Sequence, residues 1–434
     1  MLNRGNKPII NADKLLQHPL VRSGVEGELG MEYYKQFRPW LQSIANDRVF
    51  NDTGTGFWDD AAHWARTTTT MVGLGLRFTT MVIHGTTAAA NSMGELGPVW
   101  MAKGANAFLG GPQKMADAYH FVTDRSPAMA NRMREFDRDV RDGLRDIEAK
   151  SLSGASGALT SAQQGARRFA YFGISMLDMG SALPTWMGAY LKAMSPEADG
   201  GHAMSEQDAA YYADKSVRNA HGGGAAKDLA AVQRGTEYWK LATMFYSFWS
   251  HFYNRQRDTV RTAAGIGAKI GEDNAGARRD FAMVLARSWW YFVIPALLHG
   301  AIKQAPKGQS NDDENFAEWC AKEMGVSMFS GIPVVRDIAN AVATGRDYSA
   351  TPAEALIKAG FAEGKDIKNK LEGQPVSDKW LRHAIETAGY TFGLPLGQPA
   401  ASTQFLWDVG SGKVAPQDIA DWYRGMAHGD MRKH

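Results

Sequence analysis

A stretch that is rich in aromatic residues and free of charge limits the folds open to this 434-residue chain more than any other feature. No residue from Leu241 to Ser250 is charged, and apolar side chains would lie on every face of a helix formed there. A helix that is apolar all round must be enclosed, either by a large protein core or by lipid. The run is shorter than the ~20 residues that span a bilayer, so both environments stay open.

The aromatic side chains around this run form a first predicted contact surface. We expect them to touch a membrane or another subunit; they are Tyr238, Trp239, Phe245, Tyr246, Phe248, Trp249, Phe252 and Tyr253. The glycines Gly222, Gly223 and Gly224 separate this region from a polar, moderately amphipathic helix before it. Because glycine adopts backbone conformations that other residues avoid, we predict a hinge between the two helices.

Two other segments are also suited to either a protein core or lipid. Residues 67–93 are rich in Gly, Thr and Ala, which let helices approach closely, so they fit a buried helix pair or a lipid-entering segment. The uncharged run 288–302 adds four predicted contact residues: Trp289, Trp290, Tyr291 and Phe292. It is about five residues too short to span a bilayer unaided, and no window has 18 uninterrupted apolar residues. We therefore expect no ordinary membrane protein made of spanning helices.

Residues 126–150 show the clearest helical pattern. Ser126 is a predicted N-cap and Pro127 a predicted first helical residue. Apolar residues recur at steps of three and four to form one seam: Met129, Met133, Phe136, Val140, Leu144 and Ile147. The other faces carry charges of both signs, which indicates a solvated surface, with a short coiled-coil contact to another subunit as the alternative.

Two segments of small or polar residues, 151–165 and 304–315, are predicted linkers. They divide the chain into an N-terminal helical region (1–150), a central hydrophobic helical region (151–305) and a C-terminal helical and turn-rich region (306–434). In the C-terminal region we expect helices from Pro333 to Gly345 and over 379–390, and an extended, turn-rich piece over 393–400. No segment alternates polar and apolar residues, so the predicted fold is all-α: an elongated multi-helix assembly with glycine hinges and little or no sheet.

A lone acidic residue, Asp178, lies in the apolar run 169–194, whose other charged residue is Lys192 near its end. A carboxylate in such surroundings must be paired, protonated or at a helix end. Pro184 is expected to break or kink any helix there, so we assign Asp178 a structural role, such as capping the segment after Gly180. An enzyme that acts through Asp178 and Lys227 is a remaining alternative.

The sequence contains no complete enzyme motif that we recognise. The sequence His221-Gly222-Gly223-Gly224 matches the oxyanion loop of some α/β-hydrolases, but the chain has no G-x-S-x-G elbow. The single cysteine, Cys320, excludes an internal disulfide and a CxxC metal site. A net charge of +2 does not imply general binding of polyanions. We therefore expect a non-enzymatic protein with no metal and no cofactor.

Several segments, in order, resemble the C-terminal region of large polyvalent and internal virion proteins of tailed bacteriophages. The resemblance covers roughly residues 60–430 and is carried by DMGSALPTWMGAYLKA (178–193), VRNAHGGGAAKDLAAVQRG (217–235), TEYWKLATMFYSFWSHFYNRQRD (236–258), IPVVRDI (332–338), GLPLGQPA (393–400) and ADWYRGMAHG (420–429). The family includes the DNA-ejection proteins of short-tailed phages. Some members carry a lytic transglycosylase or another enzyme domain before this region, which we do not expect here.

The resemblance implies a protein that is stored in the virion interior and then passes to the host periplasm and inner membrane. There it would form part of a conduit for the genome across the host envelope. The implied partners are copies of itself, other phage ejection proteins, the portal, the host inner membrane and genomic DNA that passes without sequence specificity. The alternative is a soluble virion core or portal-associated structural protein that does not contact lipid.

Overall fold

Helices account for the regular structure of the computed structural model, and its described part contains no strand. The predicted all-α class is therefore confirmed. The described residues are 7–45, 56–74, 78–135, 138–143, 158–196, 203–224, 228–229, 231–244, 246–270, 275–298, 379–392 and 394–429, with isolated residues at 368, 369 and 372. The predicted linker at 304–315, the helix from Pro333 to Gly345, and the residues Lys227 and Phe245 lie outside this part.

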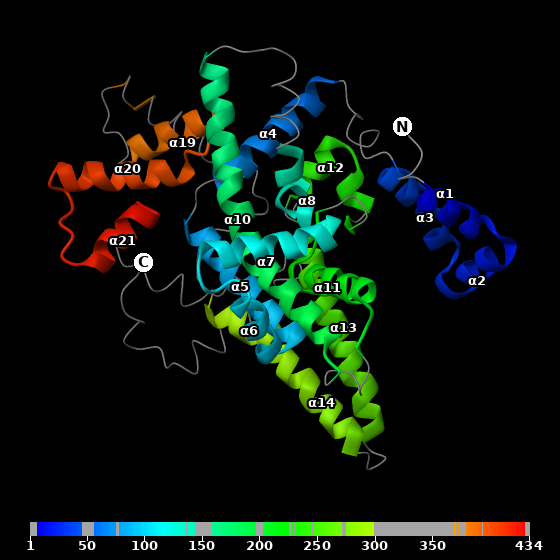
Figure 1. Cartoon of the computed structure of the whole chain (residues 1–434). Coiled ribbons are helices and arrows are strands. Elements are labelled where there is room, and N and C mark those ends of the chain that lie inside the picture. Colours follow the sequence, from blue (N-terminus) through cyan, green and yellow to red (C-terminus); the bar gives the residue numbers. More distant parts are fainter. Residues whose placement is uncertain are drawn as a thin grey trace.

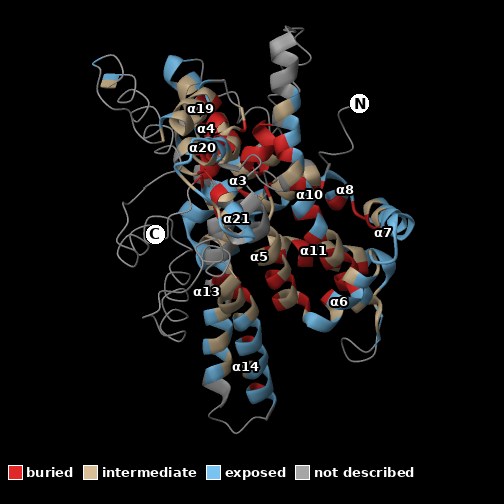
Figure 2. Cartoon of the chain, turned by 90° about the vertical axis from the view of Figure 1, so that its left-hand side faces the viewer, coloured by how far each residue is buried: buried red, intermediate tan, exposed pale blue. Residues whose placement is uncertain are grey.

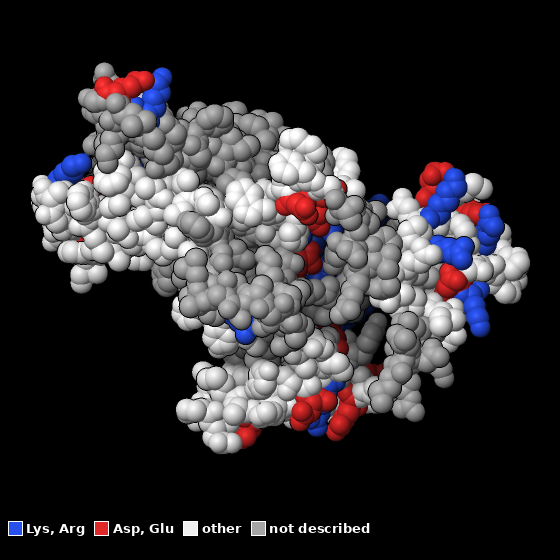
Figure 3. Space-filling model, turned by 90° about the horizontal axis from the view of Figure 1, so that it is seen from above, with Lys and Arg blue, Asp and Glu red and all other residues white. Residues whose placement is uncertain are grey.

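The first three helices pack on one another at one side of the molecule (Figure 1). They are α1 (Lys7–Gln17), α2 (Pro19–Leu29) and α3 (Met31–Ala45). Their surfaces carry local ion pairs such as Arg22–Glu26, at 2.8 Å. Charged side chains of both signs gather at this end of the face seen in Figure 3, while much of the other described surface there carries neither sign.

The body of the protein is built around one long helix, α10 (Ala158–Met194), with shorter helices packed against it (Figures 1 and 2). These are α4 (Phe57–Leu74), α5 (Phe78–Leu96), α6 (Pro98–Asn106), α7 (Pro112–Arg125), α8 (Pro127–Glu135) and α11 (Glu206–His221). Ala182, Trp186, Ala189 and Ala193 recur on its buried side at helical spacing. The rings of Trp186 and Tyr190 stack with centroids 5.1 Å apart, so an aromatic pair lies at the centre of this core.

Helix α10 bears on two predictions. It begins at Ala158, so the second half of the predicted linker 151–165 is helical. It also continues through Pro184, so the helix is not broken there, while a kink at Pro184 stays a prediction. Helix α6 packs closely against the turn of α10 that contains Pro184. A Cβ on Gly104 of α6 would lie 2.1 Å from the Pro184 carbonyl oxygen, so only glycine permits this approach.

The helix predicted from Ser126 starts as expected. The Ser126 hydroxyl accepts a hydrogen bond from the Met129 backbone N–H at 3.0 Å, and Pro127 is the first residue of α8.

The prediction of a solvated charged face is wrong. Helical residues of both signs along 127–143 are at least 92% buried: Arg132, Arg138, Asp139, Arg141 and Asp142. Each has an ion-pair partner, which is what makes their burial possible.

Beyond α11 the chain forms a short 3-10 helix, η2 (Ala231–Arg234), then α12 (Glu237–Ala242) and a long helical hairpin. The hairpin consists of α13 (Tyr246–Ile270), α14 (Ala275–Ser288) and the π-helical turn η3 (Trp289–Val293), followed by helical residues 294–298. It projects from the body, and its outer faces are largely exposed (Figures 1 and 2). We call residues 246–298 the α13–α14 hairpin.

The C-terminal helices form a separate layer on the body. They are α19 (Trp380–Phe392), α20 (Gly397–Gly410) and α21 (Ile419–His428), and α19 packs against α4. The predicted helix over 379–390 is confirmed. The predicted extended piece over 393–400 is wrong from Gly397 onward, because α20 starts there. A Cβ at Gly397 would lie 2.6 Å from the Val72 carbonyl oxygen, so close helix contact uses this glycine.

Candidate functional site at the base of the α13–α14 hairpin

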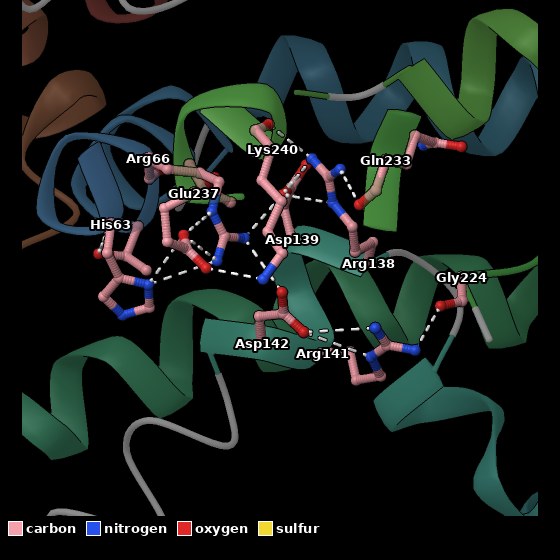
Figure 4. A network of polar contacts seen from close by, with 12 residues as sticks. His63, Arg66, Arg138, Asp139, Arg141, Asp142, Gly224, Gln233, Glu237 and Lys240 are labelled. Carbon is pink, nitrogen blue, oxygen red and sulfur yellow. Dashed lines mark hydrogen bonds and ion pairs between the residues drawn. The ribbon is translucent and has the colours of Figure 1, made fainter. Parts of the chain in front are cut away.

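A buried arginine, Arg66 of α4, organises a network of charges between the body and the connection that leads to the hairpin (Figure 4). Its guanidinium lies 3.0 Å from Asp139, 3.2 Å from Asp142 and 3.1 Å from Glu237. Burial alone would lower the pKa of Arg66, but the three carboxylates raise it, so the side chain stays charged. Lys240 contacts the same Glu237 carboxylate at 2.7 Å.

The charge of Glu237 depends on this network. Burial alone would raise the pKa of Glu237. The hydrogen bond with His63, the charge of Arg66 and the hydrogen bond from Lys240 outweigh that effect and hold the pKa well below its ordinary value of 4.5. Glu237 is the first residue of α12, so its ion pairs fix the start of this helix against α4.

Three arginines of the buried charged face hold the segment 222–243 by its backbone carbonyls. Arg132 donates to the Gly222 carbonyl at 3.2 Å, and Arg141 donates to the Gly224 carbonyl at 2.8 Å. Arg138 donates to the carbonyls of Gln233 at 3.1 Å and Lys240 at 2.9 Å (Figure 4). The carbonyls of Gly222 and Gly224, which follow α11, and those of Gln233 and Lys240, which lie in the short helices η2 and α12, thereby gain charged donors.

The glycines predicted to form a hinge lie within this held segment. Helix α11 ends at His221, and Gly222 has φ +73°, a conformation that glycine adopts readily. A Cβ on Gly223 would lie 2.6 Å from a carboxylate oxygen of Asp228. Gly224 is buried. The glycines therefore make a tight connection that the arginines fix in place, and movement about it stays a prediction.

Asp178 is paired, as expected, but it does not cap a helix. It lies inside α10 with 1% exposure, and its two oxygens accept hydrogen bonds from Arg132 at 2.7 and 3.0 Å. The partner lies 46 residues away in the sequence. Only the packing of α8 on α10 brings the two together, which is why the pair cannot be found from spacing along the chain.

Next to this ion pair, Ser92, His221 and Asp178 lie side by side in an arrangement that resembles the Ser-His-Asp triad of hydrolases. His221 Nε2 lies 3.0 Å from the Ser92 hydroxyl, and His221 Nδ1 lies 4.0 Å from Asp178. However, Ser92 has 0% exposure and its hydroxyl donates to the Ala88 carbonyl at 2.8 Å. Asp178 is already held by an arginine at both oxygens. A nucleophile must reach its substrate, so this arrangement is suited to joining α5, α10 and α11 rather than to catalysis.

A second polar cluster attaches the α13–α14 hairpin to the body. Arg255 of α13 lies over the Tyr291 ring, 4.4 Å from its centroid, and donates to the carbonyls of Asn219 and Ala220 at the end of α11. The Tyr291 hydroxyl donates to Glu95 of α5 at 2.9 Å, and the Asn219 side chain donates to the same carboxylate at 2.9 Å. We call Glu95, Asn219, Arg255 and Tyr291 the hairpin joint.

Two neighbours shape the hairpin joint. Gly94 of α5 leaves room for the tyrosine, because a Cβ there would lie 2.5 Å from the Tyr291 ring. Burial, together with the charge of Arg255, lowers the pKa of His251 to about 3, so His251 is neutral near pH 7. Its Nε2 atom lies 2.7 Å from Arg255. A neutral imidazole can accept a hydrogen bond from the guanidinium without adding a like charge.

The outer surface of the hairpin exposes large apolar side chains. Val260 is 66% exposed, Met283 46%, Leu285 55% and Trp289 53%. The helix from Gly276 to Leu298 is long and apolar enough to cross a membrane, and only 22% of its most apolar window is buried. The uncharged run 288–302 is itself shorter than a bilayer span, but its described part, 288–298, belongs to a longer helix because α14 extends it toward the N-terminus.

The predicted contact residues fall on several elements. Trp239 of α12 and Trp289 are exposed, Trp290 and Phe292 are half-buried, and Tyr291 is buried in the hairpin joint. Phe245 lies outside the described residues, and the side chains of the others are not described: Tyr238, Tyr246, Phe248, Trp249, Phe252 and Tyr253. Their role as a contact surface stays a prediction.

No protein-family model, curated protein or solved structure matches this chain. Among the residues that the structure describes, no group of three or more His, Cys, Asp or Glu side chains could hold a metal ion. The class that the fold defines is an all-α protein with a projecting helical hairpin whose base is fixed by polar contacts.

Proposed function

We propose that this chain is a non-enzymatic internal virion protein of a tailed bacteriophage, an ejection protein. It would form a homo-oligomer that is part of the conduit for the genome across the host cell envelope. The proposal rests on the sequence segments that resemble that family and on one structural observation. The apolar helix Gly276–Leu298 is mostly exposed on a projecting hairpin, whereas a core helix of a soluble protein would be mostly buried.

The two polar clusters support this proposal by separating a stable body from an arm. The body keeps its own aromatic core around Trp186 and its own ion pairs. The hairpin is attached through the hairpin joint and through the segment 222–243. We propose that the polar contacts at its base release this arm at the membrane without loss of the core, as a virion protein that later enters a membrane requires.

The exposed apolar side chains also fit contacts between copies, because neighbouring subunits in a ring or tube would bury them. The portal, other ejection proteins and genomic DNA are the further partners that we propose. Electron microscopy of the purified chain, with and without detergent, tests the assembly directly. We expect rings or tubes in detergent, and a monomer under every condition would contradict the proposed conduit.

Flotation with phospholipid vesicles tests the membrane step. We expect the full chain to float with vesicles and its tryptophan emission to shift to the blue, since Trp289 would leave water. The double variant Met283→Ser and Leu285→Ser should float less. A matched control is Leu406→Ser on α20, which removes another half-exposed leucine from a different element. No uptake at any pH or assembly state would favour the soluble virion core or portal-associated protein.

A further inference from the structure

We infer that the outer surface of the α13–α14 hairpin binds an anionic lipid surface, such as phosphatidylglycerol headgroups. This inference rests on the proposed function, because it assumes membrane contact, and it names the lipid chemistry and the residues that recognise it. Three observations support it: the concentration of positive charge on the hairpin, the interleaving of arginines with apolar residues, and the burial of the opposite side of the helix.

Positive charge is concentrated on the hairpin. Residues 254–298 contain seven Lys or Arg and four Asp or Glu, a net charge of 7 − 4 = +3. The whole chain carries only +2, so the remainder carries 2 − 3 = −1. Among the described side chains of the hairpin, five arginines and two aspartates are exposed: Arg257, Arg261, Arg278, Arg279, Arg287, Asp258 and Asp280. An anionic surface therefore attracts the hairpin in preference to the body.

One side of the helix that runs over residues 275–298 is already occupied. Ala277 and Val284 of α14 and Tyr291 of η3 are buried and recur at steps of seven, which places them along one side of this helix. Helix α14 packs against α13 and α5, and Tyr291 bonds to Glu95 of α5. Residues at other positions of α14 therefore point outward, and their apolar side chains are not needed to hold the hairpin together.

Exposed arginines and exposed apolar residues both occur on the outward surface of the helix. Arg279, Met283 and Arg287 follow one another at steps of four, so all three lie on one side of the exposed helix. Leu285 and Trp289 are exposed on another side at the same step. An arginine binds phosphate through two parallel hydrogen bonds, while neighbouring apolar groups enter the acyl boundary. A lipid surface therefore offers a partner to both kinds of residue, phosphate to the arginines and the acyl boundary to the apolar side chains.

Duplex DNA is the other polyanion that a phage protein meets. It would bind the same arginines through its phosphates, but it offers no apolar layer for Met283, Leu285 and Trp289. The exposed apolar residues on the same helix as the arginines therefore favour lipid. Arg278 and Arg279 lie near the N-terminal end of this helix, where arginine side chains commonly reach the headgroup layer.

The test compares vesicles of phosphatidylcholine alone with vesicles that also contain phosphatidylglycerol, at low ionic strength and with the full chain. The hairpin variant combines Arg279→Gln and Arg287→Gln. The matched control combines Arg22→Gln and Arg38→Gln, two exposed arginines on α2 and α3. Circular dichroism checks that both variants keep their helix content, which is expected because all four side chains are exposed.

We expect the wild-type chain to prefer anionic vesicles. The hairpin variant should bind them roughly 30-fold more weakly, as two lost arginines imply near an anionic membrane surface. Its binding to neutral vesicles and the binding of the control variant should be unchanged. Equal binding of the wild type to both vesicle types overturns the inference and leaves the proposed function intact.

The other outcomes also decide the question. Equal losses in the hairpin and control variants overturn the inference, because the effect would then come from total charge. No uptake of either vesicle type contradicts both the inference and the membrane step of the proposed function. If the hairpin substitutions weaken binding of duplex DNA and leave vesicle binding unchanged, the surface is a DNA site and the inference is wrong.

Discussion

Replacement of Asp178 by asparagine isolates the contribution of one buried ion pair. The carboxylate accepts hydrogen bonds from Arg132 at 2.7 and 3.0 Å, and the two residues are 1% and 8% exposed. The asparagine side chain would occupy the same volume, but its amide group would present N–H donors to the donors of the guanidinium. The positive charge of Arg132 would then be buried with its main partner removed, while its bond to the Gly222 carbonyl remains.

The size of the effect follows from this geometry. Removal of one partner from a buried ion pair costs about 3–5 kcal/mol of folding free energy. The low end, ~3 kcal/mol, applies here because Arg132 keeps one carbonyl acceptor. For a cooperative unit of the size of the body, ~3 kcal/mol corresponds to a fall of roughly 6–12 °C in Tm.

Thermal unfolding followed by circular dichroism measures this effect at pH 7. The control is Asp214→Asn, the same chemical change at a residue whose hydrogen-bond donors are the neutral Ser126 hydroxyl and Trp186 indole N–H. An asparagine oxygen can accept both bonds, so the control should cost less than about 1 kcal/mol. Equal losses of stability in the two variants would refute the reasoning.

Three further predictions concern other contacts. The folded pKa of Glu237 is depressed, so the stabilising contribution of this carboxylate is complete above the unfolded pKa of 4.5 and declines below it. Glu237→Gln should therefore flatten the fall of Tm below about pH 5, and an unchanged slope would contradict this. Gly104→Ala should lower Tm by overpacking, at a cost of about 1–3 kcal/mol, whereas Gly180→Ala in open space should be neutral or stabilising. Tyr291→Phe should speed hydrogen exchange in the hairpin and spare the body, while Tyr211→Phe, at an exposed tyrosine, should change neither.

The helices and many of their ends could be predicted because they depend on residues close together in the sequence. Ser126 and Pro127 start a helix through bonds and dihedral angles within one turn. The amphipathic pattern over 379–390 becomes α19, and the glycines after His221 end α11. The same local patterns excluded a sheet. All of these features are decided over a few residues, so sequence periodicity and capping preferences suffice.

The environment of each charge and the site at the hairpin base were decided only by tertiary packing. The pattern along 127–143 indicated solvent, yet Arg138 and Asp139 are 1% exposed because α4 and α12 bring opposite charges and carbonyl groups to them. The close approach of α6 to the turn at Pro184 depends on Gly104, a residue of another helix that lies far away in the sequence. A charge can be buried only where a distant partner removes the cost of desolvation, and that partner's position is set by the packing of whole helices rather than by neighbours in the sequence.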